Sequence, residues 1–246
     1  MKNLFALCAL FAACAAPAAA QNSARDKPRA VIELFTSQGC SSCPAADKLM
    51  TELAKDASLI VLTLPVDYWD YLGWKDTLAH SAFTQRQKIY AAMRSDRQVY
   101  TPQAIVNGSA HAVGSERASI EKAVLSTKEK TDILSVDVAI EKTSGGMRVK
   151  VAGSTAQGAA GHLWVLPLVS ERSVKIGRGE NSGRSLTYTN VVRGVTRISG
   201  WNGEAVTIDI PPASIPADAE GFVVLLQGGT EKKASQVLGA ARHMGL

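Results

Sequence analysis

Two cysteines, Cys40 and Cys43, lie between two segments whose patterns predict different secondary structures. Residues 30–36 are mostly apolar, which indicates a buried β-strand. Residues 44–57 place their apolar side chains on one helical face, and Asp47 falls on the other face, where we expect it to meet water. The sequence therefore predicts a strand, a short turn and a helix, with both cysteines at the start of the helix.

Residues 1–20 have the pattern of a secretory signal peptide: a lysine, an apolar run and small residues that end at Ala20. The apolar run is shorter than the roughly 20 residues that cross a membrane as a helix. Cleavage after Ala20 would remove Cys8 and Cys14; the alternative is that Cys14 becomes a lipidated N-terminus. The mature chain then keeps one pair of cysteines, and we expect it to be periplasmic or secreted.

The cysteine pair is consistent with a redox centre, half of a metal site or a structural disulfide. A bridge across so short a loop stabilises a fold only weakly. A structural zinc site needs about four clustered ligands, whereas the four histidines of this chain are scattered. The redox interpretation is therefore favoured, with no metal or cofactor. At a helix N-terminus Cys40 would be the solvent-facing nucleophile, and the more enclosed Cys43 would release the partner from the mixed disulfide.

The alternation of strands and helices continues through the first half of the chain. Residues 58–68 predict a second buried strand, and residues 77–94 predict a second helix. Two short strands are expected on either side of the Asn107-Gly108 turn, followed by a helix that Ser115 caps.

After a polar link at residues 126–132, the period of the pattern changes to two residues. Roughly eight short segments alternate polar and apolar residues between Gly, Ser and Asn, which predicts an antiparallel sandwich of immunoglobulin-like size. The last segment, residues 234–241, could equally be a helix. We therefore predict two domains, residues 27–127 and 132–246, the second of which serves docking or substrate presentation.

The charge pattern gives no support for nucleic-acid binding. If Lys2 leaves with the signal peptide, 26 of the 27 lysines and arginines remain against 22 acidic residues. This small excess is spread along the chain without a basic run. A modest basic grouping around "RGENSGR" is expected on a solvated hairpin; the alternative is a surface that docks on a partner or on the N-terminal domain. No later apolar segment is long enough to cross a membrane.

The order of elements, with Cys-x-x-Cys at the first strand-to-helix turn, resembles the thioredoxin fold. "LFTSQGCSSC" is similar to the active-site approach of glutaredoxins and thioredoxins, and Thr101-Pro102 stands where that superfamily has its cis-proline. The longer pattern "ELFTSQGCSSCPAAD…PVDYWDYLGWKD…YTPQAIVNG" resembles an uncharacterised family of secreted bacterial thioredoxin-like proteins. That family is known only as a domain of unknown function. The expected fold class is an α/β thioredoxin-like fold followed by an all-β sandwich-like domain. The resemblance implies thiol–disulfide exchange but no substrate.

The resemblance also implies supporting roles for a proline and an acid. Pro102, if cis after Thr101, would present backbone to a bound peptide; the alternative is an ordinary trans proline. Glu33 stands one residue out of register from the buried acid of thioredoxins. If buried, it could act as a base for Cys43; the alternative is a hydrogen-bonded or hydrated carboxylate at a strand end.

The segment "DYWDYLGWKD" is rich in aromatic residues. Placed over the cysteines, Tyr68, Trp69 and Trp74 would bind apolar segments of a partner protein. The alternative is a loop folded back as a small core of its own, because exposed aromatic side chains are costly.

Taken together, these features predict an exported thiol–disulfide oxidoreductase. It would act on protein thiols or disulfides in the cell envelope, and a separate redox partner would recharge its cysteines. The alternative from another class is a catalytically silent binding protein with a structural disulfide. A third alternative is delivery of copper(I) by the two thiolates, since soft ligands suit that ion.

Overall fold

The computed structural model describes residues 27–230 and 233–246. The predicted signal peptide, residues 1–20, lies outside this range together with Cys8 and Cys14. Its cleavage, the lipidation of Cys14 and the location of the protein therefore stay predictions. None of the described helices is long and apolar enough to cross a membrane.

The first half of the chain follows the predicted order of elements. β1 (Ala30–Thr36) is buried along its whole length, and α1 (Cys43–Leu53) begins at the second cysteine. α3 has Glu116 rather than Ser115 at its N-cap. The other elements of this half are β2 (Leu59–Pro65), the 3-10 helix η1 (Asp70–Leu72), α2 (Ser81–Met93), β3 (Gln103–Val106), β4 (Ala110–Val113) and α3 (Arg117–Lys128).

The second half is built from strands, as its two-residue period predicts. β7 (Gly161–Lys175) joins two segments that the sequence predicted as separate strands, and β9 (Thr196–Trp201) was not predicted. The last segment is a strand, β12 (Lys233–Met244), rather than a helix. The remaining elements are β5 (Val138–Thr143), β6 (Gly146–Val151), β8 (Ser185–Val192), β10 (Val206–Asp209), the 3-10 helix η2 (Pro212–Ser214) and β11 (Gly221–Thr230).

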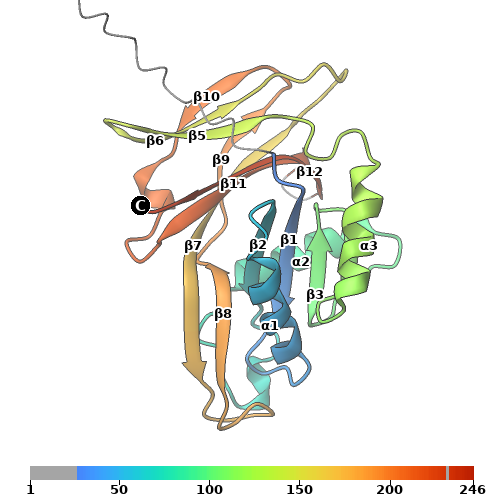
Figure 1. Ribbon diagram of the computed structural model, residues 1–246, viewed down its shortest axis with the longest axis vertical. Coiled ribbons are helices and arrows are strands. Elements are labelled where there is room, and N and C mark those ends of the chain that lie inside the picture. The colour runs from blue at the N-terminus through green and yellow to red at the C-terminus, as the bar shows by residue number, and fades with distance from the viewer. Residues whose placement is uncertain (1–26, 231–232) are drawn as a thin grey trace, which may run out of the picture.

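The prediction of a thioredoxin-like α/β fold followed by an all-β sandwich-like domain is wrong. Within the described ranges, nine strands from both halves form one mixed sheet in the order β12-β11-β7-β8-β2-β1-β3-β4, with β9 paired to β7. A second, antiparallel sheet contains β10, β6 and β5. In Figure 1 the β7–β8 hairpin runs beside α1 and β2. How the chain divides into domains stays a prediction.

The large sheet continues from one half of the chain to the other where β8 lies against the edge of β2. Thr63 pairs in parallel with Val191. The Thr63 hydroxyl donates to the carbonyl oxygen of Thr189 at 2.6 Å, and the Asn190 side chain donates to that of Val61 at 3.0 Å. These bonds satisfy backbone groups that an uncovered strand edge would leave unpaired. The sequence did not reveal this contact because the period of a strand does not depend on its partner.

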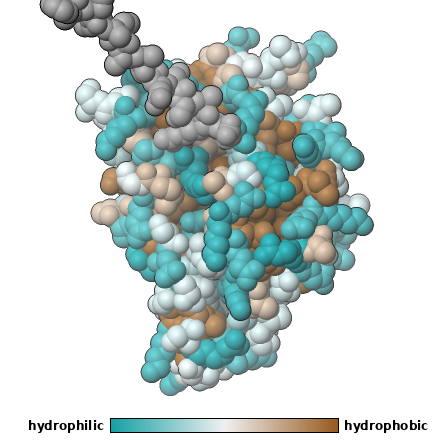
Figure 2. Space-filling view, viewed as in Figure 1, coloured by the Kyte–Doolittle hydropathy of each residue, from teal (hydrophilic) through white to brown (hydrophobic). Residues whose placement is uncertain are grey.

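Alternate residues of β1 serve different hydrophobic clusters on the two faces of the sheet. Val31 and Phe35 pack with α2 and with strands of the second half, whereas Ile32 and Leu34 pack with α1 and α3. A third cluster lies between the smaller sheet and strands β7 and β11. The face shown in Figure 2 is mostly hydrophilic, with smaller hydrophobic areas between, as expected where alternate residues of strands face water.

A buried polar cluster ties β1 to α2 and β11. Arg86 Nε donates to Glu33 Oε2 at 2.5 Å, and the Tyr90 hydroxyl donates to Glu33 Oε1 at 2.5 Å. Arg86 also donates to the side-chain oxygen of Gln227 at 3.1 Å. Burial alone would lower the pKa of Arg86, but the charges and hydrogen bonds of Glu33 and Tyr90 together outweigh burial, and the pKa rises. The guanidinium therefore stays charged inside the protein.

Replacing Arg86 should destabilise the fold strongly. Arg86→Met leaves the Glu33 carboxylate buried without its cation, and we expect a loss of about 3–5 kcal/mol in the free energy of unfolding. Denaturant unfolding would measure it. Arg117→Met is the matched control, because the Arg117–Glu52 pair is half-exposed and such pairs contribute little. Equal losses in the two variants would contradict the prediction.

Candidate functional site

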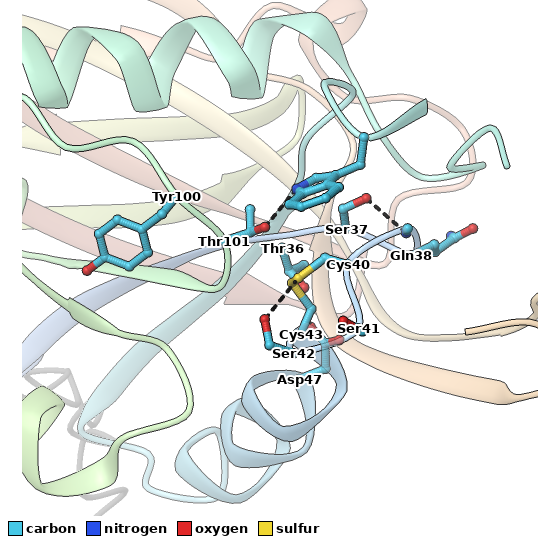
Figure 3. Close-up of a disulfide and its surroundings, with 12 residues drawn as sticks. Thr36, Ser37, Gln38, Cys40, Ser41, Ser42, Cys43, Asp47, Tyr100 and Thr101 are labelled. Atoms are coloured by element: carbon cyan, nitrogen blue, oxygen red, sulfur yellow. Dashed lines mark hydrogen bonds between the residues drawn. A yellow bond between two sulfur atoms is a disulfide. The ribbon is translucent and has the colours of Figure 1, made fainter. Parts of the chain in front are cut away.

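Cys40 and Cys43 form a disulfide at the start of α1, with their Cα atoms 5.4 Å apart. The short segment 37–42 links the end of β1 to this helix. Pro44 fits the first turn because backbone N–H groups there have no partner within the helix. The Ser42 hydroxyl lies 3.4 Å from the sulfur of Cys40 (Figure 3). The predicted cysteine pair is therefore present as a disulfide at a helix N-terminus.

Both cysteines are buried: Cys40 is 2% exposed and Cys43 is 0% exposed. The expectation that Cys40 faces solvent is wrong for the disulfide form. Distant segments of the chain cover the loop, and one of them carries Trp69. A Cβ atom added at Gly39 would lie only 3.1 Å from the Cβ of Trp69. The loop thus passes so close to Trp69 that glycine is the residue that fits at position 39 without a shift.

The hairpin tip, residues 176–184 between β7 and β8, also covers the disulfide loop. Asn181 is fully buried there, and its side-chain nitrogen donates to the carbonyl oxygens of Gln38 and Cys40, at 2.9 Å each. The backbone N–H of Ser41 donates to a carboxylate oxygen of Glu180 at 3.2 Å. The segment expected on a solvated hairpin face therefore docks on the disulfide loop.

Gln38 anchors the other side of the loop. Its backbone N–H donates to Asp76 at 2.8 Å, and its side-chain oxygen accepts the indole N–H of Trp74 at 2.8 Å. Burial raises the pKa of Asp76. The loop is thus held by polar contacts from the aromatic segment as well as from the hairpin tip.

Asp47 is the buried acid of this site, and the sequence analysis missed it. Asp47 follows Cys43 by four residues on α1, so the two share a helical face, as Figure 3 shows. The Thr36 hydroxyl donates to Asp47 Oδ1 at 2.8 Å, whereas Oδ2 has no hydrogen-bond partner among the described residues. Burial raises the pKa of Asp47 to about 8, although the Thr36 hydrogen bond opposes the shift. The carboxyl therefore titrates close to neutral pH.

The expectation that Asp47 meets water is wrong because α1 is covered on a second side by β8. The hydroxyls of Thr51 on α1 and Thr189 on β8 share a hydrogen bond of 2.8 Å. Asp47 is also one of the residues that line a pocket of about 430 Å³ between these two elements. The one feature of the sequence that could have pointed to Asp47 is its position, four residues after Cys43 on the same helix.

Glu33 is buried, which was the condition for its role as a base, but it lies on the opposite face of the sheet from α1. Its neighbours on β1 that pack with α1 are Ile32 and Leu34, whereas Glu33 itself binds Arg86 on α2. Alternate strand residues point to opposite faces, so Glu33 is held in an ion pair on the face away from Asp47. A role for Glu33 as a base for Cys43 has no support from this placement.

The Thr101-Pro102 peptide bond is cis, in agreement with the expectation. The Thr101 hydroxyl accepts the indole N–H of Trp69 at 2.8 Å (Figure 3). Trp69 therefore contacts both the segment before β3 and the disulfide loop. Whether Thr101 and Pro102 bind a peptide stays a prediction.

The aromatic segment is mainly folded back on the protein. Trp69 and Trp74 are half-buried and use their indole N–H groups within the chain. Tyr68 packs against the hydrophobic cluster of Phe35, and burial raises its pKa. The exposed aromatic residue is Tyr71, at 79%. Substrate binding by Tyr68, Trp69 and Trp74 stays a prediction.

No group of three or more His, Cys, Asp or Glu side chains in the described part of the chain is arranged to hold a metal ion. Copper(I) binding by the two cysteines alone stays a prediction.

Asp47→Asn should change how the stability of the oxidised protein depends on pH. The folded pKa of Asp47, about 8, lies above its ordinary value of 3.8. Such a group contributes stability that is fully present below the unfolded pKa and is lost as pH rises through the folded pKa. Relative to Asp47→Asn, the wild type should lose roughly 2–5 kcal/mol of unfolding free energy between about pH 4 and pH 9.

Denaturant unfolding at a series of pH values would measure this difference. Asp137→Asn, at an exposed position, is the control and should follow the wild type. Parallel curves for wild type and Asp47→Asn would show that the carboxyl is ionised across this range.

Comparison with known proteins assigns the chain to a family. Residues 31–227 match the family model described as "Protein of unknown function (DUF1223)". The crystal structure of protein AGR_C_4864 from Agrobacterium tumefaciens is similar, with a TM-score of 0.79, 29% identity and coverage of 91% of this chain and 97% of that chain. HBP35 of Porphyromonas gingivalis shares the fold alone: the TM-score is 0.58, the identity is 9%, and 89% of this chain and 75% of that chain are covered. No curated protein matches. Because the family model spans most of its length, the chain belongs to the DUF1223 family.

Proposed function

We propose that the protein is an exported oxidoreductase that exchanges disulfides with proteins of the cell envelope through Cys40 and Cys43. The observation that carries the proposal is Asp47, a buried carboxyl one helical turn from Cys43, with one oxygen that has no hydrogen-bond partner among the described residues. A buried polar group without a partner costs free energy, and a crosslink alone has no use for it. A titrating acid next to a cysteine is instead what proton transfer requires. Export rests on the predicted signal peptide.

The chemistry assigns a distinct role to each cysteine. When the disulfide is reduced, a partner thiolate attacks the sulfur of Cys40, the Cys40–Cys43 bond breaks, and its electron pair goes to Cys43. Protonated Asp47 then gives its proton to the Cys43 thiolate, directly or through one water. A pKa near neutrality keeps much of the acid protonated at the pH where this step occurs.

The reverse step uses the same groups. The Asp47 carboxylate takes the proton of Cys43, and the new thiolate attacks the sulfur of Cys40 in the mixed disulfide. The Cys40–Cys43 bond forms again, and the partner leaves as a thiolate that has gained both electrons. Asp47 is therefore an acid in one direction and a base in the other.

The burial of Cys40 means that a partner must displace part of the cover before it reacts. Tyr71 and Leu72 are exposed in the segment that also carries Trp69. They offer an apolar contact to an extended segment of a partner protein. Binding there would act on the aromatic segment, and through Trp69 on the disulfide loop.

The same burial favours a second candidate function, a binding protein whose disulfide only steadies the loop. Cys40 is 2% exposed and Cys43 is 0% exposed, and inaccessible sulfurs resist exchange. This reading explains the covered loop but not the unpartnered oxygen of Asp47.

Single-cysteine variants separate the two functions. In the proposed mechanism, Cys43→Ser leaves Cys40 free to form mixed disulfides that cannot be resolved, so adducts with envelope proteins should accumulate. Cys40→Ser should trap few adducts, because in the proposed mechanism Cys40 is the sulfur that bonds to the partner. Non-reducing gels and mass spectrometry of envelope fractions would detect them. The absence of adducts with both variants would favour the structural disulfide.

Asp47→Asn tests the role of the acid. Resolution of a mixed disulfide between Cys40 and glutathione should be slower by about tenfold or more at pH 8. In the wild type the rate should rise with pH through about 8, where Asp47 ionises, whereas the variant should lack this rise. Acid-quenched time courses analysed by mass spectrometry give the rate, and Asp137→Asn is the control. Identical pH profiles in wild type and Asp47→Asn would remove Asp47 from the mechanism.

A further inference from the structure

The hairpin tip brings a carboxylate to the disulfide loop. Ser41 and Glu180 are 139 residues apart in the sequence, yet the Ser41 N–H donates to Glu180 Oε2 at 3.2 Å. Buried Asn181, next to Glu180, holds the carbonyl oxygens of Gln38 and Cys40. This anchoring by Asn181 fixes the backbone of Glu180 relative to the loop, although the side chain of Glu180 is exposed.

The position of Glu180 matters because a thiolate at Cys40 would form beside it. The loop lies at the N-terminal end of α1, where backbone N–H groups and the helix dipole favour negative charge. The Glu180 carboxylate already accepts the hydrogen bond of the backbone N–H of Ser41, the residue next to Cys40. A carboxylate there repels a developing thiolate and leaves one backbone donor fewer for it.

We propose that Glu180 is a positioning residue that disfavours the Cys40 thiolate and so shifts the cysteine pair toward its disulfide form. This inference rests on the proposed function and gives it a direction. A pair whose dithiol is disfavoured gives up two electrons more readily. The reduced protein would therefore act as a donor of electrons to disulfides of envelope proteins, and the recharging partner would be a reductant.

Other groups near the loop act on Cys40 as well, but a change at Glu180 leaves them in place. The Ser42 hydroxyl, 3.4 Å from the sulfur of Cys40, can donate to the thiolate and favours it. Arg184 donates to the side-chain oxygen of Asn181 at 2.9 Å. Further titratable or charged side chains on the elements around the loop include Asp47, Lys48, Glu52 and Lys55 on α1, Asp70, Lys75 and Asp76 in the aromatic segment, and Arg178 and Tyr188 on the hairpin.

Glu180→Gln isolates the charge, because the amide oxygen can still accept the Ser41 N–H. In a Cys43→Ser background, the rate of alkylation against pH gives the pKa of the Cys40 thiol. We expect this pKa to fall by about half a unit to one unit when Glu180 is neutralised. With both cysteines present, the equilibrium with glutathione should move about three- to tenfold toward the dithiol. Both effects should shrink at high salt, which screens exposed charges.

The matched control is Glu171→Gln, which removes the same charge from an exposed position on β7 of the same hairpin. It should leave both the pKa and the equilibrium unchanged. An unchanged Cys40 pKa in Glu180→Gln, or an equal shift in Glu171→Gln, would overturn the proposal. A purely structural role for Glu180 would change the free energy of unfolding but not the pKa of the thiol. These measurements use purified protein and glutathione, so their outcome is independent of whether envelope adducts are found.

Discussion

The contact between β2 and β8 determines where the second half of the chain meets the first. Hydrogen bonds from Thr63 and Asn190 hold β8 beside β2, and β8 pairs from end to end with the second half of β7. The hairpin formed by β7 and β8 then runs past α1, and its tip reaches the disulfide loop (Figure 1). The burial of Asp47 and the part of the cover over Cys40 that the hairpin tip supplies both follow from this strand contact.

Two buried acids show how the same side-chain chemistry serves different ends. Both oxygens of Glu33 accept hydrogen bonds from Arg86 or Tyr90, so the charge is balanced and the cluster holds elements together. One oxygen of Asp47 accepts a hydrogen bond from the Thr36 hydroxyl, and the other has no partner among the described residues. The nearby buried acid Asp76 adds charge repulsion. A fully paired carboxylate stays ionised, whereas a half-satisfied one shifts toward its neutral form. The second arrangement is the one suited to moving a proton.

The sequence predicted what depends on neighbours along the chain. The apolar run of β1, the helix that starts at Cys43 and the short period of the second half are local patterns, and they were confirmed. The mixed sheet could not be predicted, because the pairing of Thr63 with Val191 joins residues that no local pattern relates. The same limit applied to the site. Asp47 was expected on the water-facing side of α1 because no residue near it in the sequence indicates that β8 packs there. Asn181 lies more than a hundred residues from the carbonyls that it binds.

The double hydrogen bond of Asn181 links exposure of the disulfide to the state of the hairpin. Its amide spans the carbonyls of Gln38 and Cys40, so the loop cannot move outward without breaking two buried hydrogen bonds or carrying the hairpin tip along. The undocked tip would be a minor state of the native ensemble. A ligand that binds the outer face of the hairpin in only one of these states would change the accessibility of the sulfurs without touching them, by the ratio of its affinities for the two states. If the proposed disulfide exchange takes place, binding at the β7–β8 hairpin would therefore change the reactivity of the cysteines at α1.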